Sequence, residues 1–329
     1  MQLAQMITGY WLSQAVYVAA KLGLADRLAA GPQPAADLAQ AVGAHPEALY
    51  RLLRALASVG VFVEEERQCF ALTELGAALR QDAPNSLRPM AIMMGEEHFL
   101  AWSQLLHSVR TGQRGWDQVF DLPPFEFLAC HPEQAAIFDE AMVSVHGRET
   151  AAIADAGDFS AIGTIMDIGG GNGSMLAMLL HRNPNLRGIL FDLPNVIERA
   201  RAPIAAAGLT ERCQLMSGNF FDSVPAGAKV YFMRHIIHDW TDEECTVLLK
   251  NVRRAVPPDG RLLVVESVIP PGNEPFFGKL LDLNMLVIPG GRERTAAEYR
   301  ALYATAGFRL SRIIPTASEV SLIEGLPAE

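Results

Sequence analysis

The clearest chemical signature lies in the glycine-rich segment IMDIGGGNGSML, which the residue pattern places between a strand and a helix. Gly169 and Gly171 match the first two positions of the dinucleotide-binding pattern G-x-G-x-x-G, but Ser174 stands at the third. Asp167 adds a negative charge, and beside a pyrophosphate that charge costs on the order of 1–4 kcal/mol at 4 Å. Beside the sulfonium and ammonium groups of S-adenosylmethionine (SAM) it is favourable. The loop therefore favours SAM over a dinucleotide or an unoccupied tight turn.

Two later segments fit the rest of such a ligand. Asp192 ends the predicted strand 187–191, where a carboxylate can accept both hydroxyls of a ribose; the alternative role is an N-cap for the next helix. Asn219 and Phe220 follow the strand 213–216, where an adenine ring is expected. Phe220 can stack on the ring and Asn219 can accept from its amino group, although core packing is the plainer explanation for a phenylalanine there.

The segment RHIIHDW follows the next predicted strand, 229–233, and offers a base. His238 can take a proton from a hydroxyl at neutral pH, although a lone histidine is more often structural. Glu266 ends the strand 261–265 and Glu293 lies in the turn GGRERT, so both can orient the imidazole, as a carboxylate does in serine-protease triads. Glu293 can equally be a solvated turn residue. A metal pair of His235 and His238 lacks a third ligand with suitable spacing, and we predict no metal.

The elements that must position these residues form two regions. Residues 1–90 read as helices at 3–20, 35–42 and 46–58, followed by strands at 61–63 and 69–72. Residues 91–329 contain a helical connector and, from about residue 160, alternating strands and helices. Closing strands near 308–314 and 319–324 form a hairpin, so one late strand runs antiparallel. The prediction is an α/β fold with a doubly wound, mostly parallel sheet behind a helical, winged-helix-like domain.

A winged helix raises the question of DNA binding. Residues 1–90 hold seven Lys and Arg against eight Asp and Glu, a net charge of −1, and the wing tip carries Glu64, Glu65 and Glu66. The whole chain of 329 residues has a formal charge of −10. Nucleic acid and anionic membranes would be repelled by such a charge. We therefore interpret the first region as a packing and association module.

The remaining composition predicts a cytoplasmic protein. The four cysteines are scattered without a C-x-x-C pair, as is typical of reduced thiols. Lys21 and Asp26 interrupt the longest apolar stretch near the N-terminus, so neither a signal peptide nor a membrane span is expected.

The motifs DIGGGNG, FDLP, GNFF, HDWTDE and GGRERT occur in this order, and the chain resembles the SAM-dependent small-molecule O-methyltransferases over nearly its whole length. The likeness is to plant caffeic-acid O-methyltransferases and, more closely, to bacterial enzymes that tailor antibiotics. The resemblance implies that His238 is the catalytic base, with Asp239, Glu266 and Glu293 beside it. It also implies a homodimer formed through the N-terminal domain. The residues predicted to contact SAM are Asp167, Gly169, Gly171, Asp192, Leu193, Asn219, Phe220 and Arg234.

The acceptor is expected to be a small aromatic or polyketide-type molecule with a phenolic hydroxyl. Its predicted contacts are Phe138, Met142, Val145, Trp240, Met285 and Trp102. Core packing explains these residues equally well. Asn219 and Arg234 depart from the residues common in plant members, and segment 282–291 is one residue shorter. N- or C-methylation, or another reaction on the same scaffold such as hydroxylation or decarboxylation, remains an alternative.

Overall fold

The computed structural model describes residues 2–328, and these form two compact units. The first comprises Met1–Leu100 with Cys130–Gly147, and the second comprises Ala101–Ala129 with Arg148–Glu329. We call them the N-terminal and the C-terminal unit and describe each by itself.

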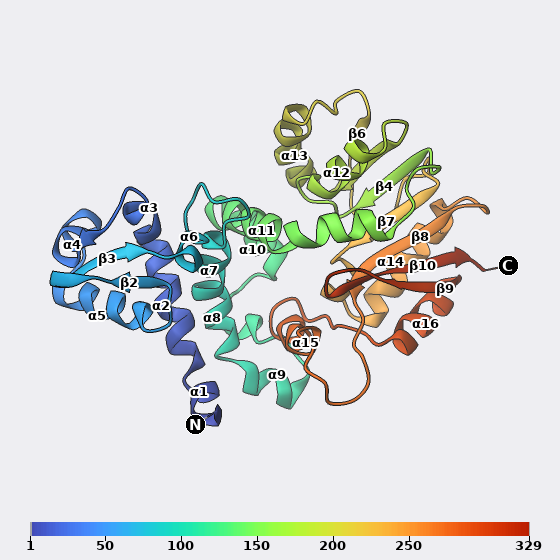
Figure 1. Cartoon of the computed structure of the whole chain (residues 1–329). Helices are drawn as coiled ribbons and strands as arrows, with labels where there is room; N and C mark the ends of the chain where they lie inside the picture. The colour runs from blue at the N-terminus through green and yellow to red at the C-terminus, as the bar shows by residue number, and fades with distance from the viewer. Residues whose placement is uncertain (1, 329) are drawn as a thin grey trace. The chain divides into compact units, whose positions relative to one another are not determined.

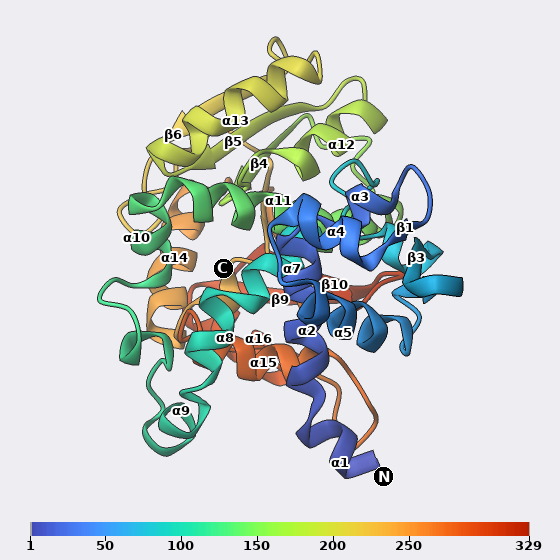
Figure 2. The same ribbon diagram turned by 90° about the vertical axis from the view of Figure 1, so that its left-hand side faces the viewer.

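The N-terminal unit is mainly helical, with a small antiparallel sheet of order β1-β3-β2. The helices α4 and α5 contact each other and lie beside this sheet (Figure 2). Leu24, Leu38, Leu53, Leu56 and Phe70 are fully buried in the unit's core. The elements from α1 to α7 are α1 (Gln2–Ile7), α2 (Gly9–Lys21), α3 (Leu24–Leu28), β1 (Gln33–Pro34), α4 (Ala35–Val42), α5 (Pro46–Ala57), β2 (Phe62–Glu64), β3 (Cys69–Leu72), α6 (Glu74–Ala77) and α7 (Arg88–Gly95).

A run of helices follows α7 in the chain. The longest has 25 residues; its part up to Gly147 belongs to the N-terminal unit and its remainder to the C-terminal unit. These helices are α8 (Glu97–Trp102), α9 (Leu105–Thr111), α10 (Pro124–Cys130) and α11 (Pro132–Ala156).

The C-terminal unit contains a seven-stranded sheet of order β6-β5-β4-β7-β8-β10-β9. Strands β4 to β8 pair in parallel, whereas β10 runs antiparallel to both β8 and β9. This confirms the predicted sheet with one antiparallel strand. The strands are β4 (Thr164–Ile168), β5 (Arg187–Asp192), β6 (Cys213–Ser217), β7 (Val230–Arg234), β8 (Arg261–Ser267), β9 (Phe308–Pro315) and β10 (Val320–Pro327).

Alternating apolar residues bury both faces of this sheet. Met166 and Ile168 of β4 pack with α14 and α16, and Ile165 packs with α12 and α13. Helices α12 and α13 lie on one side of the sheet, and α14 and α16 lie on the other (Figure 1). The central strands therefore read as continuous apolar runs, as parallel strands covered on both faces do. The helices are α12 (Ser174–Arg182), α13 (Pro194–Ala206), α14 (Asp242–Ala255), α15 (Gly278–Val287) and α16 (Ala296–Thr305).

Because β4 to β8 are parallel, the segments that follow them share one edge of the sheet. The glycine-rich loop follows β4, and the segments containing Asn219 and His238 follow β6 and β7. Asp192 and Glu266 lie at or near the ends of their own strands, β5 and β8. The topology thus brings these residues, which the sequence predicted to bind SAM or to act in catalysis, to one edge of the sheet.

Two helices of the C-terminal unit begin with a capping box, which explains where they start. Thr241 and Glu244 form a capping box at the start of α14, and Thr295 and Glu298 form a second one at α16. All four cysteines are free. In the described residues 2–328, every helix is too short or too polar to cross a membrane.

We predict that Thr241→Ala lowers the free energy of unfolding by about 1 kcal/mol, because the Glu244 backbone amide loses its cap. Thr241→Ser keeps the hydroxyl and serves as the control. Urea denaturation followed by circular dichroism measures the effect, and equal midpoints for the two variants would contradict it.

Candidate active site

The glycine-rich loop depends on backbone conformations that favour glycine. Gly169, Gly171 and Gly173 have φ angles of 67°, 59° and 78°, in the left-handed region. Gly170 is required for space, since a Cβ there would lie 2.4 Å from Leu190 Cδ1 and 2.6 Å from the carboxylate of Asp167. The loop therefore folds directly over the aspartate side chain.

Asp167 is buried under that loop, with 2% of its surface exposed. Its Oδ2 has no hydrogen-bond partner among residues 2–328. Burial raises the pKa of this carboxyl to about 7, although the nearby Arg234 guanidinium lowers it. Burial in turn lowers the pKa of Arg234, whose Nη1 donates to Thr150 Oγ1 at 2.9 Å. A buried, partly charged carboxyl group thus lies beneath the predicted cofactor loop.

Asp192 connects the end of β5 to the same loop. Its Oδ2 accepts from the Gly171 amide at 2.9 Å, and its Oδ1 accepts from the Leu193 amide at 2.7 Å. The N-cap of α13 is Leu193, and no side chain bonds there as a cap, so capping does not explain this carboxylate. The Gly171 amide, which a dinucleotide loop would direct at phosphate, is already engaged by an acid.

The segment after β6 is also ordered by local contacts. Asn219 Oδ1 accepts from the Phe221 amide at 2.9 Å, so it stabilises its own turn. The Phe220 ring lies 3.9 Å from an ideal Cβ on Gly169 and packs edge-on against Phe221 and Trp240. Phe220 therefore lies beside the glycine loop, where the sequence predicted an adenine site. Its stacking role stays a prediction.

These features fit SAM better than a nucleotide diphosphate. Two carboxyl groups, Asp167 and Asp192, contact or underlie the loop, and the Arg234 guanidinium lies near Asp167. An orphaned acidic oxygen below the loop suits a cationic ligand, whereas a pyrophosphate would face like charges.

Glu266 fixes the turn that carries the histidine. Its Oε1 accepts from three successive backbone amides, those of Ile236 (3.0 Å), Ile237 (2.9 Å) and His238 (3.3 Å). Consecutive amides that point inward form a site for an anion. Glu266 is fully buried, and although burial favours its neutral form, His238 and His235 hold its pKa below the usual value. An ionised glutamate is thus enclosed by the turn.

His238 lies among carboxylates in this turn. Its Nδ1 is 2.7 Å from Glu293 Oε1 and 3.3 Å from Glu266 Oε2, and its Nε2 is 3.6 Å from Asp239 Oδ1. Burial lowers the pKa of His238, but the charges of Glu266, Asp239 and Glu293 outweigh this effect and raise the pKa to about 10. Burial raises the pKa of Asp239 to about 7. The structure therefore brings together all four predicted catalytic side chains.

The turn before α16 holds Glu293 against the histidine. The Glu293 amide donates to Asp282 Oδ1 at 2.9 Å, and the Arg292 amide donates to the His238 carbonyl at 2.8 Å. A Cβ at Gly291 would lie 2.0 Å from that carbonyl, so only glycine allows this approach. The two turns are therefore built against each other.

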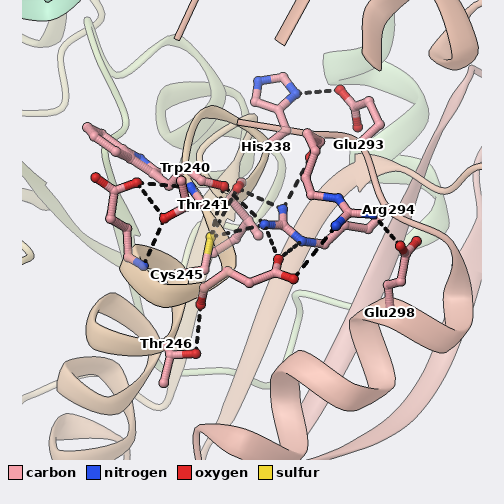
Figure 3. A network of polar contacts seen from close by, with 12 residues as sticks. His238, Trp240, Thr241, Cys245, Thr246, Glu293, Arg294 and Glu298 are labelled. Carbon is pink, nitrogen blue, oxygen red and sulfur yellow. Dashed lines mark hydrogen bonds and ion pairs between the residues drawn. The ribbon is translucent and has the colours of Figure 1, made fainter. Parts of the chain in front are cut away.

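Arg294 is a buried residue to which the sequence analysis gave no role. Its guanidinium donates to the carbonyls of Ile237 and Trp240, both at 3.0 Å, and to Asp242 Oδ1 at 2.7 and 2.9 Å (Figure 3). It is 1% exposed. The signal in the sequence was its place next to Glu293 in GGRERT, but the residue pattern does not distinguish a buried arginine from a solvated one.

His235 and Glu149 also form a pair that the sequence analysis did not predict. His235 Nε2 lies 2.8 Å from Glu149 Oε2. Donor atoms of His235, His238 and Glu266 lie within 4.8 Å of one another, close enough for a metal ion. Each imidazole already has a carboxylate oxygen within 2.8 Å, and these hydrogen bonds account for the cluster.

The predicted acceptor residues fall in both units. Trp240 packs against Phe221 and Phe125, with ring centroids 4.7 and 5.7 Å apart. Met285 is buried in α15, and Trp102 Nε1 donates to Asn284 Oδ1 at 2.8 Å. The remaining three, Phe138, Met142 and Val145, are half-buried residues of α11 in the N-terminal unit. Their contact with an acceptor stays a prediction.

We predict that Arg294→Gln lowers the free energy of unfolding by about 3–5 kcal/mol, because buried carbonyls and Asp242 lose their partner. Arg292→Gln is the control: its side chain is 46% exposed beside Glu298, so its loss should cost less than about 1 kcal/mol. Chemical denaturation compares the two. Similar losses for both variants would show that burial of Arg294 is not what stabilises the turns.

Comparison with known proteins places this site in a family. Residues 102–309 match the O-methyltransferase domain, and residues 4–82 match the O-methyltransferase dimerisation domain. The chain is 48% identical to the phenazine O-methyltransferase PhzM of Lysobacter antibioticus, covering 99% of this chain and 95% of that protein. It is 39% identical to the mitomycin biosynthesis 6-O-methyltransferase of Streptomyces lavendulae, covering 97% and 92%.

The crystal structure of LaPhzM superimposes with a TM-score of 0.96 at 48% identity, covering 99% of this chain and 98% of that one. The predictions of family, fold and cofactor are therefore confirmed. The chain belongs to the O-methyltransferase family with an N-terminal dimerisation domain, and it is a SAM-dependent O-methyltransferase.

Proposed function

We propose that this enzyme methylates a phenolic hydroxyl of a small aromatic natural product, with His238 as the general base. One observation carries the proposal: a buried imidazole has two glutamates at its Nδ1 side, at the sheet edge that also carries the glycine loop. The names of the two relatives, which act in phenazine and mitomycin chemistry, support an aromatic or quinone-like acceptor. Trp240 and its aromatic neighbours offer a flat apolar surface for such a ring.

The position of the carboxylates assigns the tautomer. With Glu293 and Glu266 at Nδ1, the neutral ring holds its proton there and leaves Nε2 to take the proton of the acceptor hydroxyl. The same carboxylates stabilise the imidazolium that results. A base positioned in this way contributes typically 10²–10⁴-fold in rate, whereas an amine acceptor needs no such base. His238 therefore favours O-methylation over N-methylation.

With no cation bound nearby, the surrounding carboxylates hold the pKa of His238 at about 10, so the imidazole is protonated at neutral pH. When bound, SAM supplies the methyl group and a positive charge. That charge opposes protonation of His238 and moves its pKa down toward neutral pH, so the ring can act as a base in the cofactor complex.

The dimerisation domain supports a homodimer. Leu3, Met6, Ile7, Tyr10 and Trp11 of the first two helices are more than half exposed in the single chain. A second copy of the chain can cover such an apolar surface. We therefore propose a homodimer formed through the N-terminal unit.

We predict that His238→Ala lowers kcat by about 10²–10⁴-fold while the Kd for SAM changes less than about twofold, because the base acts on the acceptor. His181→Ala, an exposed histidine at the end of α12, is the control. Calorimetry with SAM and mass spectrometry of phenol products measure the two quantities. Full turnover of a phenol by His238→Ala would refute the assignment of the base.

We predict that Glu293→Gln shifts the acid limb of the kcat/KM profile to lower pH. Glu293 raises the pKa of His238, so removing its charge makes the imidazole easier to deprotonate. The rate plateau should also fall because a glutamine orients the ring less firmly. Glu243→Gln, at an exposed position in the first turn of α14, should leave the limb in place. A limb that moves to higher pH in Glu293→Gln would contradict the role given to this carboxylate.

A further inference from the structure

His235 has a backbone conformation that residues other than glycine rarely adopt. Its φ angle is 54°, in the left-handed region. It follows directly after β7, and its amide donates to the Val265 carbonyl at 3.1 Å. A glycine or asparagine would adopt this φ more easily. Such a conformation persists where the surrounding contacts enforce it.

Those contacts form a second imidazole–carboxylate pair. His235 Nε2 lies 2.8 Å from Glu149 Oε2 of α11, and the imidazole is 7% exposed. On the other side of the ring, Nδ1 lies 3.7 Å from Glu266 Oε2. The imidazole thus lies between two carboxylates, one from a helix and one from the sheet.

Glu266 is shared between the two histidines. Its Oε1 is engaged by the three amides of the turn, which leaves Oε2 for the imidazoles. Oε2 lies 3.3 Å from His238 Nδ1 and 3.7 Å from His235 Nδ1, and the two ring centroids are 5.1 Å apart. A change in charge on one ring is therefore felt by the other through a single buried oxygen.

We propose that His235 is a positioning residue for the general base: paired with Glu149, it provides a positive charge that competes for Glu266 and so makes His238 easier to deprotonate. This inference rests on the proposed role of His238. It assigns to His235 an effect on the proton affinity of His238.

The charges around His235 support this assignment. Within the C-terminal unit, the groups that face it include Glu149 of α11, Glu266 of β8, Glu293, and Asp239 and His238 of the adjoining turn. Burial lowers the pKa of His235, but the interactions with Glu149 and Glu266 outweigh this effect, so the pKa lies above its usual value. Two imidazolium ions 5.1 Å apart in a buried site repel each other, so a cation at His235 weakens proton binding at His238.

His235→Gln tests the proposal. The glutamine amide can still donate to Glu149, but it does not titrate. We expect the midpoint of His238 in the SAM-bound protein to rise by about 0.5–1 pH unit, because a neighbouring cation is removed. Nitrogen-15 NMR of labelled histidine measures this midpoint, with the His238 signals identified by their loss in His238→Gln.

The acid limb of kcat/KM should move to higher pH by a similar amount, opposite to the shift expected for Glu293→Gln. Glu149→Gln is the second variant: it weakens the charge on His235, so it should raise the His238 midpoint as well. His181→Gln is the control and should leave the midpoint unchanged.

The outcomes separate this inference from the proposed function. A His238 midpoint that stays within about 0.2 pH unit of wild type in both His235→Gln and Glu149→Gln would overturn the role of His235. The NMR measurement needs no methyl transfer. If the midpoint rises while His238→Ala retains full activity, the coupling between the two rings stands and the assignment of the base fails.

Discussion

The ion–amide contact of Glu266 determines how the whole site is arranged. One carboxylate oxygen accepts three successive amides of the turn 236–238, and the other faces two imidazoles. An ionised carboxylate without such partners would be very costly inside a protein. The turn therefore closes around Glu266 because its amides and the imidazoles satisfy that charge. In closing, it sets the backbone position of His238. The same contact fixes His238, the proposed general base, and stabilises the chain that carries it.

The second turn adds the partners that the first one lacks. Glu293 meets His238 Nδ1 at 2.7 Å, and Arg294, the next residue, binds the carbonyls of Ile237 and Trp240. Neighbouring side chains of one turn thus contact the charged ring and the backbone of the other. Because the interaction of buried groups depends steeply on geometry, this double attachment keeps the imidazole in one orientation. The residues of GGRERT act as a unit for this reason.

The sequence predicted the sheet, its one antiparallel strand and the grouping of the motifs at one edge, since these follow from apolar periodicity and from the rule for parallel strands. It also singled out His238, Glu266 and Glu293 from their residue types, and the structure brings these three side chains together; their catalytic roles stay a prediction. It did not reveal the buried role of Arg294 or the pairing of His235 with Glu149. Both depend on which of many polar side chains is enclosed by tertiary packing, and no local pattern encodes that. Asp167 was predicted to meet the cofactor's charge, but its depth beneath Gly170 follows from the loop conformation alone.

That depth changes how the acidic loop works. With a pKa of about 7, the Asp167 carboxyl is only partly ionised at neutral pH when no cation is near. A positive ligand above the loop stabilises its charged form, so ligand binding and ionisation favour each other. Asp167 therefore carries a full negative charge mainly when the cation is present to offset the cost of burying that charge. His238 responds in the opposite sense, because the same cation opposes its protonation. In the proposed mechanism, one positive charge thus favours ionisation of Asp167 and deprotonation of His238, the proposed base.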